Sequence, residues 1–219
     1  MEFDSFQTHP INSEPLVEFG EWYKAARRTP SRWAHNFALA TVDEGGGPQS
    51  RTVSLHSFDE RGFVFCSNYV GPKAVQIESN PKVSMYFTWE GLRRTVRING
   101  TCTKIPRQET EILYNKCRPE EKLYFYSSSQ GMDHPFNQST PYNSHEEFLN
   151  YQETMKHSFG IGKYFFITGE EKSIPLPENW GGFRIEPHSI EFLDLSKTKL
   201  GRFIYVKQNG TWTKQYLVM

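Results

Sequence analysis

A series of short strand-like segments, each followed by a tight turn, constrains the fold of this chain most. Turn-forming residues separate neighbouring segments, as in Gly45-Gly46-Gly47-Pro48 and Asp59-Glu60-Arg61-Gly62. Sequential antiparallel strands joined by short turns are typical of a β-barrel. We therefore expect a mainly β chain of the α+β type. The expected strands are residues 37–42, 49–58, 62–67, 82–89, 93–103, 189–195, 201–206 and a last strand through residue 216 after the Asn209-Gly210 turn.

Helical spacing occurs in four other stretches. In the first, Leu16, Phe19 and Trp22 recur at intervals of three and four, which makes one face apolar. Pro119 ends the third helix, because the residue before a proline disfavours helical backbone. No repeat or linker divides the chain, so we expect one domain over residues 1–219. The expected helices are residues 14–28, 71–80, 109–117 and 145–157.

Charge and cysteine content narrow the class of protein. The chain has 25 basic and 25 acidic residues, so no general attraction to nucleic acid or to an anionic membrane is expected. No apolar run approaches the roughly 20 residues of a membrane-spanning helix. Three widely spaced cysteines and histidines without ligand spacing indicate neither a disulfide framework nor a metal site. We expect a soluble, cytoplasmic protein.

Two cationic residues stand where an anion can be held. Arg51 lies early in the second strand, and Lys73 follows the Gly71-Pro72 turn at a helix start. Free backbone N–H groups and the helix dipole favour an anion there. Each residue taken alone is more often a solvated surface charge. Taken together, the two positions suggest a bound phosphorylated cofactor.

Five stretches of sequence resemble one known family, in its order and at nearly its spacing. They are LATVDEGGGPQSRTVSLHSFDERGFVFCSN, KAVQIESNP, FTWEGLRRTVRING, YNKCRP and PLPENWGGFRIEPHSIEF. The family is that of pyridoxamine 5'-phosphate oxidase. The resemblance implies a split β-barrel that binds FMN at the interface of a homodimer. It also implies a role in vitamin B6 metabolism, in pyridoxine biosynthesis. In the implied reaction, O2 oxidises pyridoxine or pyridoxamine 5'-phosphate to pyridoxal 5'-phosphate.

The resemblance also implies which residues contact the cofactor. In the family, the residues matching Arg51 and Lys73 hold the FMN phosphate. Gln130 matches a loop glutamine from the second subunit, and Arg202 matches an arginine near the flavin ring. The other matching positions are Thr52, Val53, Ser54, Leu55, His56, Cys66, Ser67 and Thr95. Cys66 suits core packing equally well, and no catalytic residue is assigned.

Substrate contacts follow from the same resemblance. Tyr114 and Arg118 match the tyrosine and arginine that hold the substrate phosphate, and their spacing of four places both on one helix face. A packing tyrosine and a helix-terminal arginine are the alternative interpretation. Lys122 occupies a position where the family has serine, and its ammonium group is a point charge that can bind phosphate. Lys199 is a further candidate for binding the phosphorylated substrate.

Departures from the family pattern lie at these contacts. Only the last residue of the family signature Arg-Leu-His-X-Arg survives at residues 198–202, and the segment 131–179 is long for the family. Three readings therefore stay open: the oxidase, an FMN-dependent oxidoreductase acting on another substrate, and a non-enzymatic flavin or pyridoxal-phosphate binder. The single-residue departures are His56 for lysine, Pro72 for arginine, Thr95 for glutamine and Leu193 for tryptophan.

Overall fold

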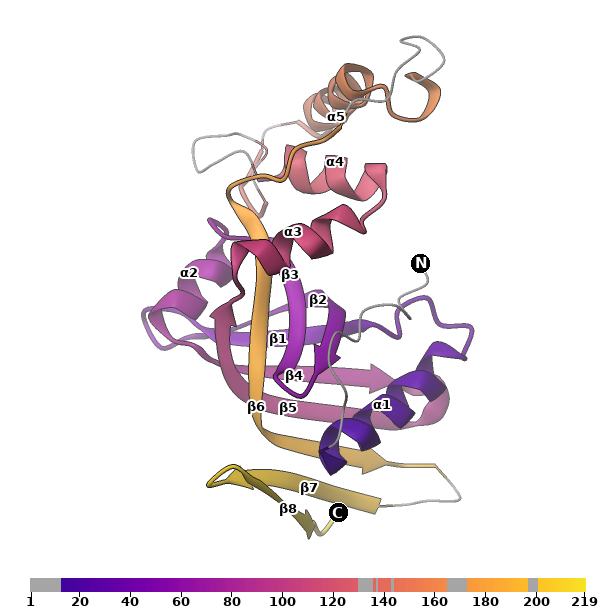
Figure 1. Ribbon diagram of the computed structural model, residues 1–219, viewed down its shortest axis with the longest axis vertical. Helices are drawn as coiled ribbons and strands as arrows, with labels where there is room; N and C mark the ends of the chain where they lie inside the picture. Colours follow the sequence, from indigo (N-terminus) through magenta and orange to yellow (C-terminus); the bar gives the residue numbers. More distant parts are fainter. Residues whose placement is uncertain (1–12, 130–135, 137, 143, 165–172, 197–200) are drawn as a thin grey trace. The chain divides into compact units, whose positions relative to one another are not determined.

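Two compact units make up the chain. The computed structural model describes residues 13–129, 136, 138–142, 144–164, 173–196 and 201–219 (Figure 1). Unit 1 comprises residues 1–65, 76–103 and 183–219, and unit 2 comprises residues 66–75 and 104–182. The expectation of a single domain stays a prediction.

A closed β-barrel forms most of unit 1. The sheet order is β3-β2-β1-β4-β5-β6-β7-β8, and an additional pairing of β3 with β6 closes the first six strands of that order. The pairs β1–β2, β1–β4, β2–β3, β4–β5, β6–β7 and β7–β8 are antiparallel. The barrel fold expected from the sequence is thereby confirmed. The strands are β1 (Asn36–Val42), β2 (Pro48–Asp59), β3 (Gly62–Asn68), β4 (Lys82–Trp89), β5 (Arg94–Lys104), β6 (Trp180–Asp194), β7 (Gly201–Gln208) and β8 (Thr211–Tyr216).

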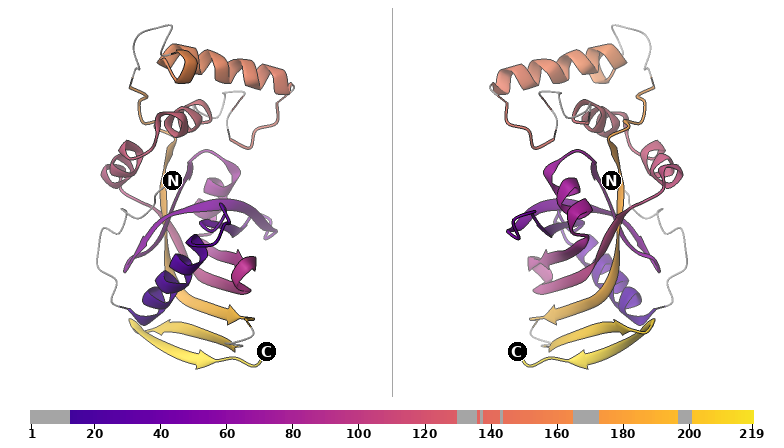
Figure 2. Two further views of the ribbon diagram at one scale, coloured as in Figure 1. Left: turned by 90° about the vertical axis from the view of Figure 1, so that its right-hand side faces the viewer. Right: turned by 90° about the vertical axis from the view of Figure 1, so that its left-hand side faces the viewer.

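Aromatic side chains fill the barrel of unit 1. Helix α1 (Glu14–Arg27) packs Phe19 edge-on against Phe58 and Phe63, with ring centroids 4.9 Å apart in both pairs. Figure 2 shows α1, in indigo, lying against the strands of this unit. Strand β4 alternates buried and more exposed residues, with Phe87 facing the same cluster. Burial of each such side chain contributes about 1.5–3 kcal/mol, so α1 is part of the barrel core.

The β6 strand is longer than the sequence predicted. We expected a strand over residues 189–195, whereas β6 runs continuously from Trp180 to Asp194. Pro187 explains the difference, because proline lacks an N–H group and argues against a central strand. At the other end of the sheet, Asn209 and Gly210 have φ angles of 50° and 81°, and they form the expected turn between β7 and β8.

Unit 2 is mainly helical. Helix α2 (Pro72–Ser79) begins in it, and α3 (Arg107–Asn115), α4 (Pro119–Ser127), α5 (His145–Phe159) and the short helix Gly162–Tyr164 lie wholly within it. Helix α4 was not expected. From the sequence, Pro119 predicts only the end of α3, yet proline is also favoured at the first helical position, which it occupies in α4. Leu123, Ile161 and Ile174 form a small core of this unit.

Two further features bear on the class of protein. Along the described part of the chain, no helix is both long enough and apolar enough to cross a bilayer. All three cysteines, Cys66, Cys102 and Cys117, are free thiols.

Candidate functional site

Arg51 is a partly buried cation of unit 1 that is held by neutral oxygens. Its Nη1 donates to the Leu39 carbonyl at 3.2 Å and to Thr41 Oγ1 at 2.6 Å, and its Nη2 donates to Gln76 Oε1 at 2.7 Å. No carboxylate among the described residues pairs with it. Burial lowers the pKa of the guanidinium, because desolvation disfavours its charged form. The site therefore lacks a counter-charge and suits an anionic ligand.

The rest of β2 alternates between the core and the surface. Val53 and Leu55 point into the core, whereas Thr52 and Ser54 are exposed, and Ser54 Oγ donates to Asn36 Oδ1 at 2.9 Å. His56 lies where the β2–β3 register shifts, and it is half-buried. The side chains of Val53 and Leu55 are thus committed to packing. A ligand on this strand would meet their backbone rather than their side chains.

Lys73 is a buried cation of unit 2. Only 8% of this residue is exposed. Its Nζ donates to Ser67 Oγ at 2.9 Å and to Gln138 Oε1 at 2.8 Å. The structure thus brings together two residues expected at the cofactor, Lys73 and Ser67, at the start of α2 and the end of β3.

Gln138 is a site residue that sequence reasoning missed. Its backbone N–H donates to the Ser128 carbonyl, which also accepts from Asn68 Nδ2 at 2.7 Å. These bonds fix Gln138 beside Ser67 and Lys73. The expected loop glutamine, Gln130, lies outside the described residues. Both glutamines occur in one polar tract, and their spacing alone favours neither.

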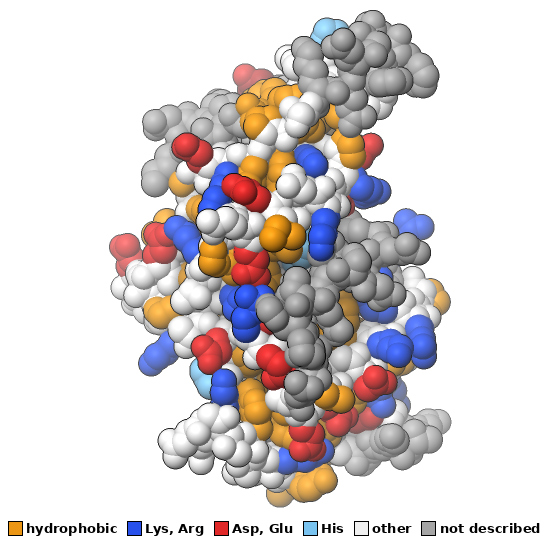
Figure 3. All heavy atoms as spheres, in the orientation of Figure 1, with side chains coloured by type: hydrophobic (Ala, Val, Ile, Leu, Met, Phe, Trp, Pro, Cys, Tyr) orange, Lys and Arg blue, Asp and Glu red, His pale blue; other side chains and the backbone are white. Residues whose placement is uncertain are grey.

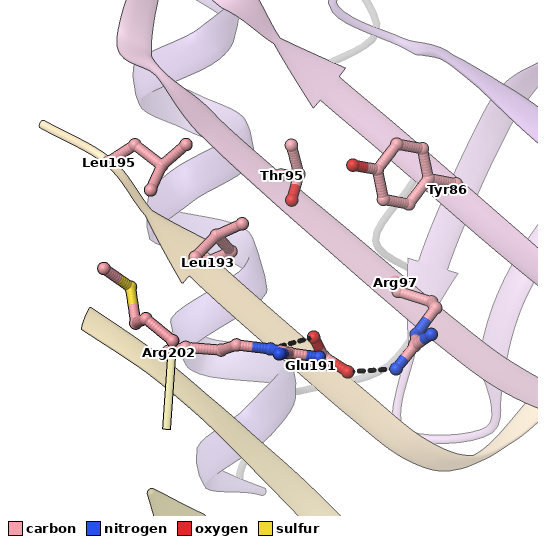
Figure 4. Close-up of a pocket in the computed structure, with 8 residues that line it drawn as sticks. Tyr86, Thr95, Arg97, Glu191, Leu193, Leu195 and Arg202 are labelled. Atoms are coloured by element: carbon pink, nitrogen blue, oxygen red, sulfur yellow. Dashed lines mark hydrogen bonds and ion pairs between the residues drawn. The ribbon is translucent and has the colours of Figure 1, made fainter. Parts of the chain in front are cut away.

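A pocket of about 390 Å³ crosses strands β4 to β7 of unit 1. We call it the strand pocket, and Figure 4 shows its lining. Thr95 and Arg202, both expected near the flavin, line it together. Arg202 Nε donates to Glu191 Oε1 at 2.7 Å, and Arg97 Nη2 donates to Glu191 Oε2. Its lining residues are Tyr86, Thr95, Arg97, Glu191, Leu193, Leu195, Arg202 and Met219.

A second, more open hollow of about 420 Å³ lies over β1, β2 and β4 of the same unit. Thr52 lines this hollow, and Tyr86 lines both it and the strand pocket. Trp33 is 72% exposed at its edge. Trp33, Phe37 and Tyr86 of this lining are aromatic and suit a ring-shaped ligand, because aromatic side chains stack on π-faces.

Three of the expected substrate residues, Tyr114, Arg118 and Lys122, lie in unit 2, where the structure corrects their arrangement. Tyr114 and Arg118 do not share a helix face, because α3 ends at Asn115 and Arg118 is the N-cap of α4. The Tyr114 hydroxyl donates to the Pro175 carbonyl at 3.0 Å, and burial raises the pKa of this phenol. Arg118 is exposed and pairs with Glu121 at 3.3 Å. Among the described substrate candidates, Lys122 adjoins Tyr114, with its Nζ 5.4 Å from the ring centroid. Lys199 lies outside the described residues.

The thiols show no sign of activation. Burial raises the pKa of Cys66, and it raises the pKa of Cys117 to about 11. A thiolate is the reactive form of cysteine, so these groups stay protonated near neutral pH. On the face shown in Figure 3, basic and acidic side chains are interspersed without a large patch of one sign. Within the described residues, no cluster of three histidine, cysteine or acidic side chains offers a metal site.

A closed barrel that carries a partly buried arginine, whose partners among the described residues are neutral, has features that suit an anionic ligand. The family model described as pyridoxamine 5'-phosphate oxidase matches residues 28–136. The pyridoxine/pyridoxamine 5'-phosphate oxidase of Dichelobacter nodosus is 35% identical over 216 residues, covering 95% of this chain and 93% of the relative. That of Rubrobacter xylanophilus is 34% identical, covering 92% and 85%. The chain belongs to the pyridoxamine 5'-phosphate oxidase family.

Two solved structures share the fold. PhzG from Burkholderia lata 383, in complex with tetrahydrophenazine-1-carboxylic acid, has a TM-score of 0.78 at 22% identity and covers 99% of this chain and 95% of its own. An FMN-binding, pyridoxamine 5'-phosphate oxidase-related protein from Nostoc punctiforme has a TM-score of 0.72 at 17% identity, covering 95% and 98%. The family expected from the sequence is therefore confirmed. It is a family of oxidoreductases, and FMN is its cofactor.

Proposed function

We propose that this chain is an FMN-dependent oxidase that converts pyridoxine or pyridoxamine 5'-phosphate to pyridoxal 5'-phosphate. The main observation behind this proposal is the partly desolvated guanidinium of Arg51, whose hydrogen-bond partners within the described part of the chain are all neutral. A phosphate bearing nearly two negative charges is best held by fixed donors and cations together. Arg51 provides such a place, at the position where the family holds the FMN phosphate.

The residues present fit FMN in several respects. Lys73 of unit 2 has its ammonium group fixed by Ser67 and Gln138. Ser129 Oγ is buried and has no hydrogen-bond partner among the described residues, so it is a donor that a ligand oxygen would satisfy. Bound FMN supplies the redox chemistry, and the chain supplies binding, orientation and electrostatics.

The overall reaction balances with O2 as the oxidant. The substrate loses two electrons and two protons, and O2 takes them up as hydrogen peroxide. For pyridoxamine 5'-phosphate, water replaces the amine, which leaves as ammonia. Lys122 is the described cation of unit 2 best placed beside Tyr114 to meet a substrate phosphate. We further propose a cytoplasmic homodimer in which the second subunit completes the cofactor site.

A second function is favoured by the corrected arrangement of the phosphate residues. The Tyr114 hydroxyl is committed to Pro175, and Arg118 is committed to Glu121. Leu193, where the family has tryptophan, leaves an apolar wall in the strand pocket beside two arginines. These features suit an FMN-dependent oxidoreductase acting on another flat, anionic substrate. A carboxylate in place of the phosphate would suit the arginines equally well.

Turnover of defined substrates tests the proposal. The purified protein is loaded with FMN, and its flavin absorbance is recorded. Pyridoxine 5'-phosphate and pyridoxamine 5'-phosphate are then supplied with O2. We expect pyridoxal 5'-phosphate and hydrogen peroxide in equal amounts. Unphosphorylated pyridoxamine is the matched control, and it should turn over much more slowly because it lacks the anionic handle.

The outcomes distinguish the oxidase, the oxidoreductase that acts on another substrate and the non-enzymatic binder. Flavin that binds but is not reduced by either phosphate ester, even without O2, contradicts the oxidase and favours the second function or a binding role. Protein that cannot be loaded with FMN excludes both enzymatic functions.

A further inference from the structure

Glu191 is a buried carboxylate shared by two arginines of the strand pocket. The residue is 8% exposed, whereas the side chains of Arg97 and Arg202 are 46% and 35% exposed. One carboxylate oxygen accepts from Arg202 Nε at 2.7 Å, and the other accepts from Arg97 Nη2. Figure 4 shows Glu191 between the two guanidinium groups. Both carboxylate oxygens thus accept hydrogen bonds from the two arginines.

Strand register explains why Glu191 can fix the direction of the Arg202 side chain. Arg202 of β7 pairs with Leu193 of β6, whereas Glu191 pairs with Ile204. Glu191 and Arg202 are therefore diagonal neighbours on two paired strands, a separation that long side chains bridge. Arg202 must lean along the strand to reach the carboxylate, which selects one of its many rotamers.

The atoms used in the ion pair leave the end of Arg202 available. Glu191 takes the Nε hydrogen, and neither terminal nitrogen of Arg202 donates to any residue that the structure describes. One carboxylate against two guanidiniums also leaves a net charge of +1 on the trio by formal count. The lining of the strand pocket thus presents oriented donors and one uncompensated positive charge.

We propose that Glu191 is a positioning residue that holds the terminal nitrogens of Arg202 toward the flavin ring, with Arg97 sharing the carboxylate. The inference rests on the proposed function, because the group served is FMN. A fixed cation stabilises the negative charge that the ring carries when reduced, and a preorganised one does so without reorganisation. Glu191 acts through Arg202 and does not itself touch the ring.

The direction in which each variant changes the midpoint potential of bound FMN tests this proposal. The midpoint potential of bound FMN is measured in the wild type and in Glu191→Gln, Arg202→Met and the double variant. Loss of the Arg202 cation destabilises the reduced ring and lowers the potential. Glu191→Gln should also lower it, because Arg202 is released. A carboxylate acting only through its own charge predicts the opposite, since removing a negative charge raises the potential.

Two further variants control for folding. Glu191→Asp keeps the negative charge but shortens the side chain by one methylene, so it neutralises the arginines yet cannot span both. It should fold like the wild type and lower the potential less than Glu191→Gln does. Glu186→Gln removes an exposed carboxylate from the same strand, where it pairs with Lys207 at 3.2 Å, and should leave the potential unchanged. Thermal unfolding is recorded for all variants.

The proposal predicts that adding Glu191→Gln to Arg202→Met changes the potential little, because residues acting as one unit are non-additive. A raised potential in Glu191→Gln, an unchanged potential in Glu191→Asp, or a full additional shift in the double variant would overturn it. A wild type that binds no FMN overturns the proposed function and this inference with it. A wild type that binds FMN while Glu191 variants leave its potential unchanged overturns the inference alone.

Discussion

At the scale of single residues, Arg51 is expected to contribute more to FMN binding than to the stability of the fold. Desolvation of an uncompensated cation costs free energy in the unliganded protein, and three neutral hydrogen bonds offset only part of that cost. Arg51→Met should weaken FMN binding by about 1–3 kcal/mol, the range of a charge-assisted contact. The free energy of unfolding without FMN should change by less than about 1 kcal/mol. Flavin fluorescence titration and chemical denaturation measure the two quantities.

Arg28→Met is the matched control, since Arg28 is an exposed arginine at the end of α1. It should alter neither quantity. A large loss of stability in Arg51→Met with unchanged FMN affinity would make Arg51 a structural residue.

Residues of the candidate site differ in how far sequence could predict them. Arg51 and Lys73 follow from local signals, a strand position and a helix start. Gln138 does not, because it contacts Lys73 across 65 residues of chain, and no local pattern encodes such a pairing. Tyr114 and Arg118 were placed on one helix from spacing alone, but the helix break at Pro119 decides their directions.

At the scale of elements, closure of the barrel depends on two glycines that flank β6. A Cβ atom at Gly62 of β3 would overlap the Ile185 carbonyl, and one at Gly100 of β5 would overlap the Glu186 carbonyl and approach Ile185 Cγ2 to 2.7 Å. Gly62 also has a φ of 123°, a conformation that other residues rarely adopt. The alternation of the strands predicted the barrel, but it did not show where strands approach so closely.

Gly100→Ala should destabilise unit 1 by about 1–3 kcal/mol, because overpacking against backbone forces the strands apart. The free energy of unfolding in urea measures this effect. Gly91→Ala is the control, since nothing lies within 4 Å of a Cβ atom at Gly91. It should stay within about 0.5 kcal/mol of the wild type. Equal behaviour of the two variants would show that the approach of β5 to β6 relaxes without strain.

At the scale of the whole molecule, balanced formal charge conceals two carboxylates in the barrel of unit 1 that are buried more deeply than Glu191. Asp59 and Asp194 are each 3% exposed. Asp59 pairs with Arg184 at 3.1 Å and with Arg61 at 2.7 Å, and Asp194 pairs with Arg94 at 2.9 Å. The sequence places Asp59 in a turn but does not predict its ion pair, because Arg184 is 125 residues away. Such distant ion pairs are set by strand order rather than by local pattern.

These carboxylates set the expected acid sensitivity. Burial acts to raise the pKa of Asp59, but hydrogen bonds from Arg61 and the charges of Arg184 and Arg61 outweigh it, so the pKa is lowered. Burial likewise opposes the bonds from Ser196 and Arg94 at Asp194, whose pKa is also lowered. A lowered folded-state pKa gives stability that is complete above the unfolded value of about 3.9 and is lost as pH falls through the folded value.

The free energy of unfolding should therefore fall as pH drops below about 4, and Asp59→Asn should make that fall shallower. At neutral pH the same variant should be less stable by about 3 kcal/mol, because the Arg184 side chain, only 11% exposed, loses its ion pair with Asp59. Urea unfolding at a series of pH values measures both effects. Glu44→Gln, which removes an exposed carboxylate from the β1–β2 turn, should keep the wild-type profile. An Asp59→Asn profile parallel to that of the wild type would mean that other groups cause the acid sensitivity.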